Sequence, residues 1–150
     1  MFGILKDKEI ENLLHTQVLG RIGCSSGERM FVVPINYGYD GKCLYAHSKE
    51  GMKIDMMRAN NNVCFEVDKL EADGSWSSVI VWGVYEEIKN IRSQRAAMKI
   101  FTEQMARLIP DPKAMPSHGF VSGAEKTNNP FKSVVFKIRI TEKTGRFENK

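Results

Sequence analysis

Two runs of strand-forming residues, joined by a tight turn, constrain the fold of this chain more than any other feature. Residues 30–37 and 43–47 are rich in apolar and aromatic side chains, and they flank the pair Asp40-Gly41. An Asp-Gly pair between such runs is typical of a short antiparallel hairpin. Pro34 lies inside the first run and predicts an edge strand, a strand end or a bulge, because proline cannot donate to a central ladder. We therefore expect an antiparallel sheet.

The rest of the chain adds further strands and a few amphipathic helices. Apolar residues at helical spacing predict helices over residues 7–16, 49–59 and 93–108, with Ser93 as the cap of the third. Alternating apolar residues predict strands over residues 18–24, 63–67, 77–88 and 133–141. In the 77–88 strand both sets of alternating residues are apolar, which implies that both of its faces are mostly covered. This order predicts a mainly β fold, α+β by helix content, in which an antiparallel barrel carries peripheral helices.

Composition limits the class of protein. With 150 residues and 42% hydrophobic residues, the chain is expected to form one domain over residues 1–150. It has no apolar run of ~18 residues, so we expect no membrane contact and a cytoplasmic location. Cys24, Cys43 and Cys64 form no C-x-x-C pair, which predicts neither a disulfide framework nor a metal site. The net charge of +4 is spread along the chain and suits a small anionic ligand as well as nucleic acid.

The segment after the second hairpin strand is the best candidate for a ligand site. A strand delivers His47 and Ser48 to the expected helix start, and Gly51 and Lys53 follow within one turn. Helix N-termini attract phosphate through unpaired backbone N–H groups and the positive end of the helix dipole. Ser48 adds a hydroxyl donor and Lys53 a positive charge. The segment predicts either a phosphate monoester site or simply a capped surface helix.

Five segments together resemble the pyridoxamine-phosphate-oxidase-like flavoprotein superfamily, and most closely its nitroimidazole-resistance reductases. These segments are residues 20–23 (Gly-Arg-Ile-Gly), 33–37 (Val-Pro-Ile-Asn-Tyr), 44–53, 63–67 (Val-Cys-Phe-Glu-Val) and 78–83 (Ser-Val-Ile-Val-Trp-Gly). The resemblance implies a six-stranded antiparallel split β-barrel of Greek-key type and a homodimer with one FMN per subunit. Pyridoxamine phosphate oxidases end in a segment whose arginine binds the substrate phosphate, whereas this chain is much shorter, so that particular oxidation is not expected.

The resemblance also implies a set of cofactor contacts. Along the flavin ring it places Val33, Pro34, Ile35 and Asn36; near the ribityl phosphate, His47, Ser48 and Lys53; and beside the pocket, Ser78 and Val79. An edge strand interrupted by Pro34 agrees with this, because its free backbone groups are able to meet the ring nitrogens and oxygens. Trp76 and Trp82 are expected either to stack on the flavin or substrate or, preferably, to lie in the core or the dimer interface.

The resemblance implies an FMN-dependent oxidoreductase that reduces small electron-poor molecules such as 5-nitroimidazoles, with NAD(P)H or another electron donor. His47 is the catalytic candidate, since a histidine close to a reduced flavin is able to donate a proton. Alternatively, His47 orients the phosphate or packs in the hairpin. A flavin store or sensor without turnover is the second hypothesis, and a deazaflavin is an alternative ring. A nucleic-acid-binding barrel is a third hypothesis that no basic and aromatic run supports.

Overall fold

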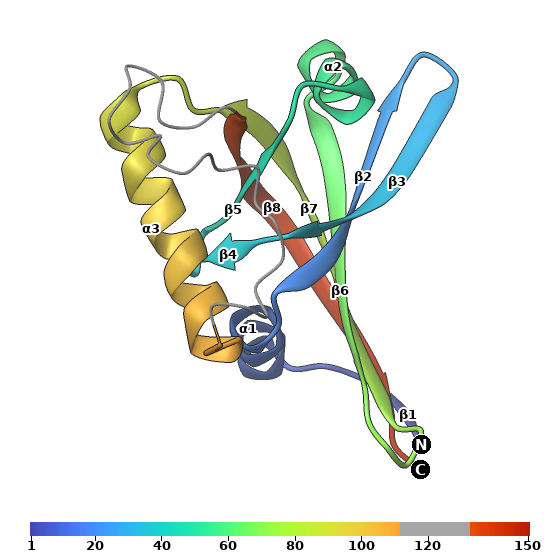
Figure 1. The fold of residues 1–150 in the computed structure, drawn as a ribbon. Helices are drawn as coiled ribbons and strands as arrows, with labels where there is room; N and C mark the ends of the chain where they lie inside the picture. Colours follow the sequence, from blue (N-terminus) through green and yellow to red (C-terminus); the bar gives the residue numbers. More distant parts are fainter. Residues whose placement is uncertain (112–132) are drawn as a thin grey trace.

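The computed structural model describes residues 1–111 and 133–150 and shows a curled antiparallel sheet with three helices around it (Figure 1). The helices are α1 (Asp7–Thr16), α2 (Met52–Ala59) and α3 (Ile91–Leu108). The strands are β1 (Phe2–Ile4), β2 (Leu19–Ser26), β3 (Arg29–Asn36), β4 (Gly38–Tyr39), β5 (Cys43–Ser48), β6 (Asn62–Leu70), β7 (Trp76–Glu87) and β8 (Val134–Glu148). The expected mainly β fold is confirmed, and the short strands β1 and β4 are additions to the six expected ones.

All strand pairs are antiparallel, in the order β3-β2-β6-β7-β8-β5-β4, with β1 beside β8. Pro34 lies on β3, which is an edge strand of this sheet, as the missing N–H predicts. The long strands β6, β7 and β8 cross the whole molecule and end beside both termini (Figure 1). A bulge between Trp82 and Gly83 interrupts the β7–β8 register, and bulges of this kind bend a strand and increase its twist.

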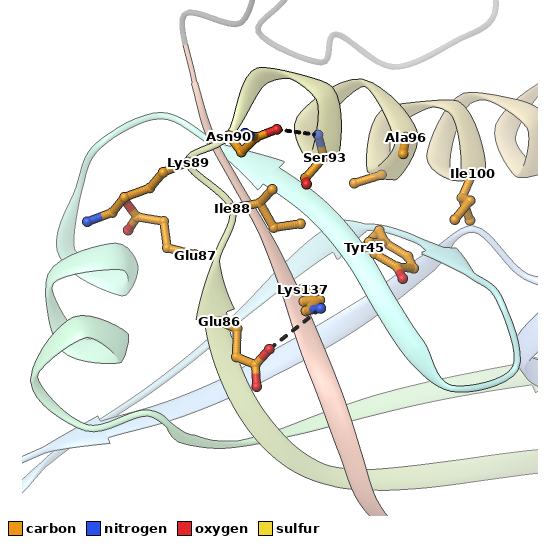
Figure 2. Close-up of a pocket in the computed structure, with 11 residues that line it drawn as sticks. Tyr45, Glu86, Glu87, Ile88, Lys89, Asn90, Ser93, Ala96, Ile100 and Lys137 are labelled. Atoms are coloured by element: carbon orange, nitrogen blue, oxygen red, sulfur yellow. Dashed lines mark hydrogen bonds and ion pairs between the residues drawn. The ribbon is translucent and has the colours of Figure 1, made fainter.

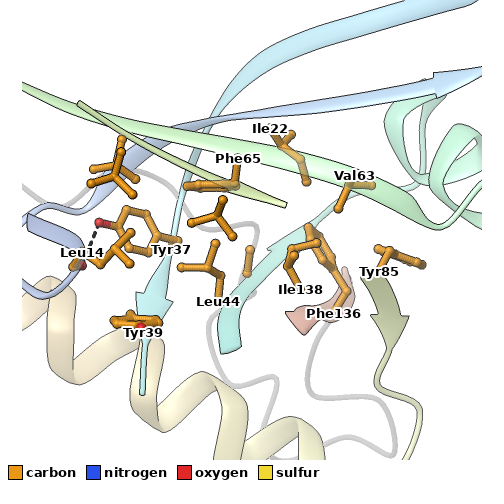
Figure 3. Packing of buried hydrophobic residues seen from close by; sticks show 14 of the residues in the cluster. Leu14, Ile22, Tyr37, Tyr39, Leu44, Val63, Phe65, Tyr85, Phe136 and Ile138 are labelled. Atoms are coloured by element: carbon orange, nitrogen blue, oxygen red, sulfur yellow. Dashed lines mark hydrogen bonds between the residues drawn. The ribbon is translucent and has the colours of Figure 1, made fainter. Parts of the chain in front are cut away.

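The inner face of the curled sheet forms the main core (Figure 3). Its largest fully buried side chains include Tyr37, Phe65 and Phe136. Helix α1 covers one end of this core with Leu13 and Leu14, whose spacing produced the correct helix bounds in the sequence. The Tyr37 hydroxyl donates to the Leu14 carbonyl oxygen over 2.8 Å, so the polar end of this buried ring is satisfied.

Helix α3 packs on the other side of β5 and β8 through a second cluster, which includes Ala97, Met98, Phe101, Met105 and Val135. A buried glutamine on the same helix, Gln104, ties three elements together. Its side-chain oxygen accepts from the Tyr39 amide at 2.8 Å, and its nitrogen donates to the carbonyl oxygens of Leu14 at 3.1 Å and Gln17 at 2.7 Å. This amide therefore fixes α3 against β4 and the end of α1.

Four expectations need correction. Helix α2 begins at Met52 rather than residue 49, because Gly51 is its N-cap. The cap of α3 is Asn90, whose side chain accepts from the Ser93 amide, so Ser93 is not the cap. The last strand runs to Glu148 instead of 141. Among residues 1–111 and 133–150, one face of β7 is fully covered and the other is only partly covered, since Ile80 is 38% exposed.

Two further expectations concern cysteines and membranes. All three cysteines are free thiols; two are buried and Cys64 is half-buried. Among the described helices, none combines the length and the apolar character that a membrane crossing requires.

Candidate functional site

The start of α2 is a helix N-terminus that no side chain caps. Gly51 is the N-cap residue in an extended conformation, and its carbonyl oxygen accepts the Asp55 amide at 3.0 Å. Ser48, three residues earlier, donates its hydroxyl to the Lys49 carbonyl oxygen at 3.0 Å instead of capping the helix. The first amide groups of α2 thus have no side-chain acceptor within the described chain, and such groups together with the helix dipole favour an anion.

Lys53 adds an unpaired positive charge to this helix start. Its side chain is half-buried, and the structure gives it no ion pair with any carboxylate of residues 1–111 and 133–150. Burial lowers the pKa of the Lys53 ammonium below its usual value, and the nearby Cys24 on β2 opposes that shift. A partly desolvated cation without a counter-ion is a favourable partner for an anionic ligand.

His47 and Ser48 are neighbours on β5 and therefore point to opposite faces of the sheet. The His47 ring lies edge-on to Phe101 of α3, with 5.2 Å between ring centroids. Its Nδ1 atom is 3.1 Å from the Ser133 hydroxyl, and the residue is only 8% exposed. The structure does not bring the imidazole and the Ser48 hydroxyl together on one face, and the catalytic role of His47 stays a prediction.

The edge strand β3 offers a mixed surface. Val33 and Ile35 are half-buried and pack against the main core, whereas Pro34 is exposed beside Arg21 of β2. The Asn36 side chain donates to the Val18 carbonyl oxygen at 3.0 Å. These four residues lie on an edge strand of the sheet, and alternate side chains face its two sides. Their contact with a flavin stays a prediction.

Ser78 belongs to a polar row on the outer face of the sheet. Its hydroxyl donates to Glu66 at 3.0 Å, and Arg21 reaches Glu66 at 3.5 Å and Asp68 at 3.2 Å. Burial, together with the neighbouring Asp68, raises the pKa of the Glu66 carboxyl above its usual range. The adjacent Val79 side chain is fully buried in the core, so of this pair only Ser78 presents a side chain to the outer face.

Apolar side chains surround this polar row. Ile80 and Trp82 are 38% and 39% exposed on β7, and Val32 is 69% exposed on β3. Cross-strand pairs link them in space, because Cys64 pairs with both Gly23 and Trp82, and Gly23 pairs with Val32. Trp82 therefore lies on an exposed sheet face. The ring N–H group of Trp76 donates a hydrogen bond to the Glu148 carboxylate at 2.9 Å.

The cavity shown in Figure 2 lies apart from all these residues. It has a volume of about 440 Å³ and lies between the start of α3 and strands β5, β7 and β8. Glu86 and Lys137 form an ion pair of 3.6 Å in its wall, and Tyr45 lies nearby. None of the catalytic and cofactor-binding candidates predicted from the sequence lines this cavity.

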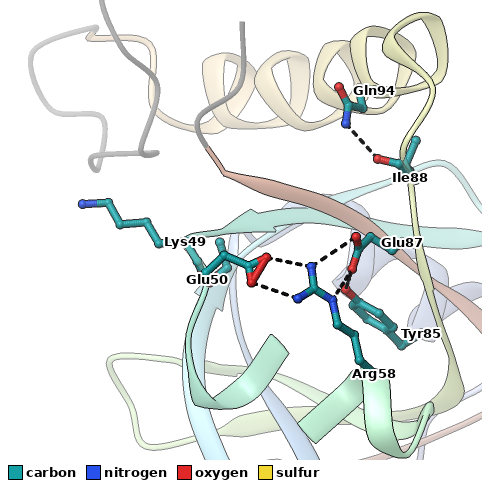
Figure 4. A network of polar contacts seen from close by, with 8 residues as sticks. Lys49, Glu50, Arg58, Tyr85, Glu87, Ile88 and Gln94 are labelled. Atoms are coloured by element: carbon teal, nitrogen blue, oxygen red, sulfur yellow. Dashed lines mark hydrogen bonds and ion pairs between the residues drawn. The ribbon is translucent and has the colours of Figure 1, made fainter. Parts of the chain in front are cut away.

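One group near α2 escaped the sequence analysis. Arg58 lies between the carboxylates of Glu50 and Glu87, and the Tyr85 hydroxyl donates to Glu87 (Figure 4). The only sequence signal was a glutamate and an arginine eight positions apart, which does not correspond to a helical pair.

The chain matches the family model of pyridoxamine 5'-phosphate oxidase over residues 6–147. A FAD-binding protein of Mesorhizobium loti shares 28% identity over 99% of both chains, with a TM-score of 0.77. A candidate 5-nitroimidazole antibiotic resistance protein of Bacteroides thetaiotaomicron shares 26% identity over 98% of this chain and 87% of its own, with a TM-score of 0.72. The FAD-binding protein of Mycobacterium smegmatis shares 25% identity over 97% of this chain and 100% of its own, with a TM-score of 0.67.

An uncharacterised protein of Rhizobium meliloti is 32% identical over 85 residues. That match spans 57% of this chain and 56% of the relative. The family model, in contrast, covers almost the whole chain and includes the helix start at Gly51, the edge strand with Pro34 and the outer sheet face. The chain therefore belongs to the pyridoxamine 5'-phosphate oxidase family.

Proposed function

We propose that this chain binds FMN and acts as a flavin-dependent oxidoreductase. The observation that carries the proposal is the start of α2, which no described side chain caps, beside the half-buried Lys53, which has no ion pair within residues 1–111 and 133–150. A phosphate monoester supplies the acceptor oxygens and the negative charge that this arrangement lacks. Two similar structures are FAD-binding proteins, which supports a flavin as the bound group.

The remaining site residues have supporting roles in this proposal. The edge strand, with Val33, Pro34, Ile35 and Asn36, lies along the flavin ring, and Ser48 lies on the phosphate side. The His47 side chain points to the opposite face of β5, so His47 contributes to the phosphate side only through its backbone. Ser78 lies beside the flavin on the outer face of β7, and Val79, whose side chain is buried in the core, contributes only its backbone. The bound flavin supplies the electron-transfer chemistry, while the protein contributes binding, orientation and exclusion of water.

The protein works as a homodimer in this proposal. The outer sheet face exposes Val32, Ile80 and Trp82 around the partly buried Glu66. Exposed apolar side chains grouped in this way favour a protein–protein interface. A second copy of the chain supplies a matching apolar face through two-fold symmetry. The substrates are small electron-poor molecules, among them 5-nitroimidazoles, and NAD(P)H or another donor reduces the flavin.

A flavin store or sensor without turnover is the second candidate. It is favoured by the position of His47, which is the only proposed proton donor but is buried against Phe101 and close to Ser133. Turnover separates the two candidates: consumption of NAD(P)H coupled to reduction of a nitro compound supports the oxidoreductase, and its absence with several donors and acceptors supports the store.

The Lys53→Ala variant tests the phosphate site. We expect its affinity for FMN to fall by ~10–100-fold, because one charge-assisted contact to the phosphate is lost. Its affinity for riboflavin, which has no phosphate, is expected to stay unchanged. Titration followed by flavin fluorescence measures both, and Lys99→Ala, on the exposed surface of α3, is the control with the same charge change. Unchanged FMN affinity in Lys53→Ala would place the phosphate elsewhere.

A further inference from the structure

We propose that Arg58 is a positioning residue that holds the Glu50 carboxylate away from the start of α2 and so keeps that helix start open to the cofactor phosphate. The inference rests on the proposed FMN site and names a second residue pair on which its affinity depends.

Arg58 holds Glu50 through both carboxylate oxygens. Its Nη1 atom donates to Glu50 Oε2 at 2.9 Å, and its Nη2 atom donates to Glu50 Oε1 at 2.7 Å. Paired contacts of this kind fix the orientation of a carboxylate as well as its distance. Figure 4 shows the Glu50 carboxylate facing Arg58, while the neighbouring Lys49 extends the other way.

The position of Glu50 makes this orientation important. Glu50 immediately precedes Gly51, the N-cap residue of α2, and Arg58 lies near the other end of the helix. A helix rises 1.5 Å per residue, so the Arg58 backbone is roughly 10 Å further along the axis. Both oxygens of the Glu50 carboxylate are thus engaged by Arg58, and no side chain of the described residues caps the first amides of α2. A released carboxylate at this position is able to accept from those amides and to repel a phosphate.

Strand β7 anchors Arg58 from the other side. Arg58 Nε donates to Glu87 Oε1 at 2.7 Å, and the Tyr85 hydroxyl donates to the same oxygen at 2.8 Å. The hydrogen bond from Arg58 lowers the pKa of the Glu87 carboxyl below its usual range. Glu87 is thus a fixed anionic partner, and it is held by a tyrosine that does not depend on Arg58.

Two alternatives for Arg58 fit the structure less well. Its side chain is 41% exposed, and exposed ion pairs contribute little to the stability of a fold. Its charge is also balanced by two carboxylates, so direct attraction of a phosphate by Arg58 is weak. The role that the contacts of Arg58 support best is therefore to fix the position of the Glu50 carboxylate.

The test is a set of titrations with FMN and riboflavin, followed by flavin fluorescence, on the full-length chain. In Arg58→Ala we expect FMN to bind ~5–30-fold more weakly, in the range of a like charge placed beside a phosphate. We expect riboflavin affinity to stay unchanged. The double variant R58A/E50Q is expected to recover wild-type FMN affinity within about twofold, because the competing carboxylate is gone.

The matched control is R58A/E87Q, which has the same net charge as R58A/E50Q but retains the free Glu50 carboxylate. We expect it to remain as weak as Arg58→Ala. Equal recovery in both double variants would show that net charge alone sets the affinity and would overturn the inference. Failure of R58A/E50Q to recover, or wild-type affinity in Arg58→Ala, would also overturn it.

Folding and the cofactor assignment are checked in the same experiment. If Arg58→Ala does not fold, Arg58→Lys replaces it, since lysine keeps the charge but cannot hold both carboxylate oxygens in a planar fork. Arg58→Lys is then expected to weaken FMN binding with no change for riboflavin, and wild-type affinity for FMN overturns the inference. A wild-type chain that binds neither FMN nor riboflavin overturns the proposed function as well. If Lys53→Ala weakens FMN binding but Arg58→Ala does not, only this inference is overturned.

Discussion

The two faces of β7 differ sharply in how far their apolar side chains are buried. Val79 and Val81 point inward and are fully buried in the main core. Ile80 and Trp82, which alternate with them along the same strand, point outward and are 38% and 39% exposed. Both faces carry apolar side chains, yet within the described part of the chain only the inner one is fully covered.

This difference shows how an alternating pattern should be interpreted. Apolar residues on both faces of a strand predict that both faces are buried, but they do not identify which element or subunit buries each face. The inner face is covered by the rest of the barrel and by α1, which Leu13 and Leu14 attach to the core. The outer face, in our proposal, is covered by a second copy of the chain.

Substitution in the inner face is expected to have the largest effect. Phe65 lies on β6, opposite Val81 of β7, and is buried in the same inner face. Phe65→Ala should lower the free energy of unfolding by ~3–5 kcal/mol, because it leaves a cavity at a fully buried position. Leu70→Ala, at the exposed end of the same strand, is the control and should change it by less than about 0.5 kcal/mol. Urea unfolding at one fixed protein concentration measures both. Similar losses in the two variants would contradict the division between the faces.

Substitution in the outer face should leave the fold intact but separate the subunits. Ile80→Asp places an unpaired charge in the proposed interface and should weaken dimerisation by ~2–3 kcal/mol, or about 30–150-fold. Sedimentation velocity across a concentration series measures this change. Ile91→Asp, at a similarly exposed isoleucine on α3, should remain a dimer. A monomeric wild-type protein, or an Ile80→Asp dimer of unchanged affinity, would contradict the proposed role of this face.

A polar contact on the inner side is expected to give the smallest effect. Glu11 of α1 accepts hydrogen bonds from Tyr39 at 2.6 Å and from Lys143 of β8. Burial alone raises the pKa of the Glu11 carboxyl, but these hydrogen bonds outweigh it and the net pKa is lowered from 4.5. A carboxyl whose pKa is lowered in the folded state stabilises the protein at pH values above its ordinary pKa. This stabilisation is lost as the pH falls through the pKa of the folded state.

Glu11→Gln should therefore cost about 1 kcal/mol at neutral pH, after allowance for the partial exposure of the pair. The difference from the wild type should shrink once the pH falls below 4.5, the ordinary value for this carboxyl. Urea unfolding at several pH values gives this profile. Glu103→Gln, at an exposed pair on α3, is the control, and a Glu11→Gln deficit that stays constant into acid would contradict the assignment.

The sequence predicted most of the fold, since most of it follows from local spacing. The 7–16 helix followed from Ile10, Leu13 and Leu14, and the edge position of β3 is one of the three alternatives that Pro34 predicted, beside a strand end and a bulge. What local spacing did not reveal depends on tertiary contacts. Strand β8 continues to Glu148 because β7 and β1 both pair with it, although charged residues interrupt its alternation there.

The candidate site was predicted less completely. Lys53 was correctly placed in the first turn of α2, because helix and phosphate signals coincide there. The opposite orientations of His47 and Ser48 follow from the two-residue period of a strand and were overlooked. The Arg58 clamp was not predictable, because Glu87 lies 29 positions from Arg58 and only the folded sheet brings the two together.

The most direct test of the central claim is the visible absorption spectrum of the purified protein after FMN has been added and the excess removed. The account predicts flavin bands near ~370 and ~450 nm at about one FMN per chain. Loss of most of this flavin in Lys53→Ala would assign the binding to the start of α2. A wild-type protein that remains colourless would contradict the claim that this helix start and its unpaired lysine hold a flavin phosphate.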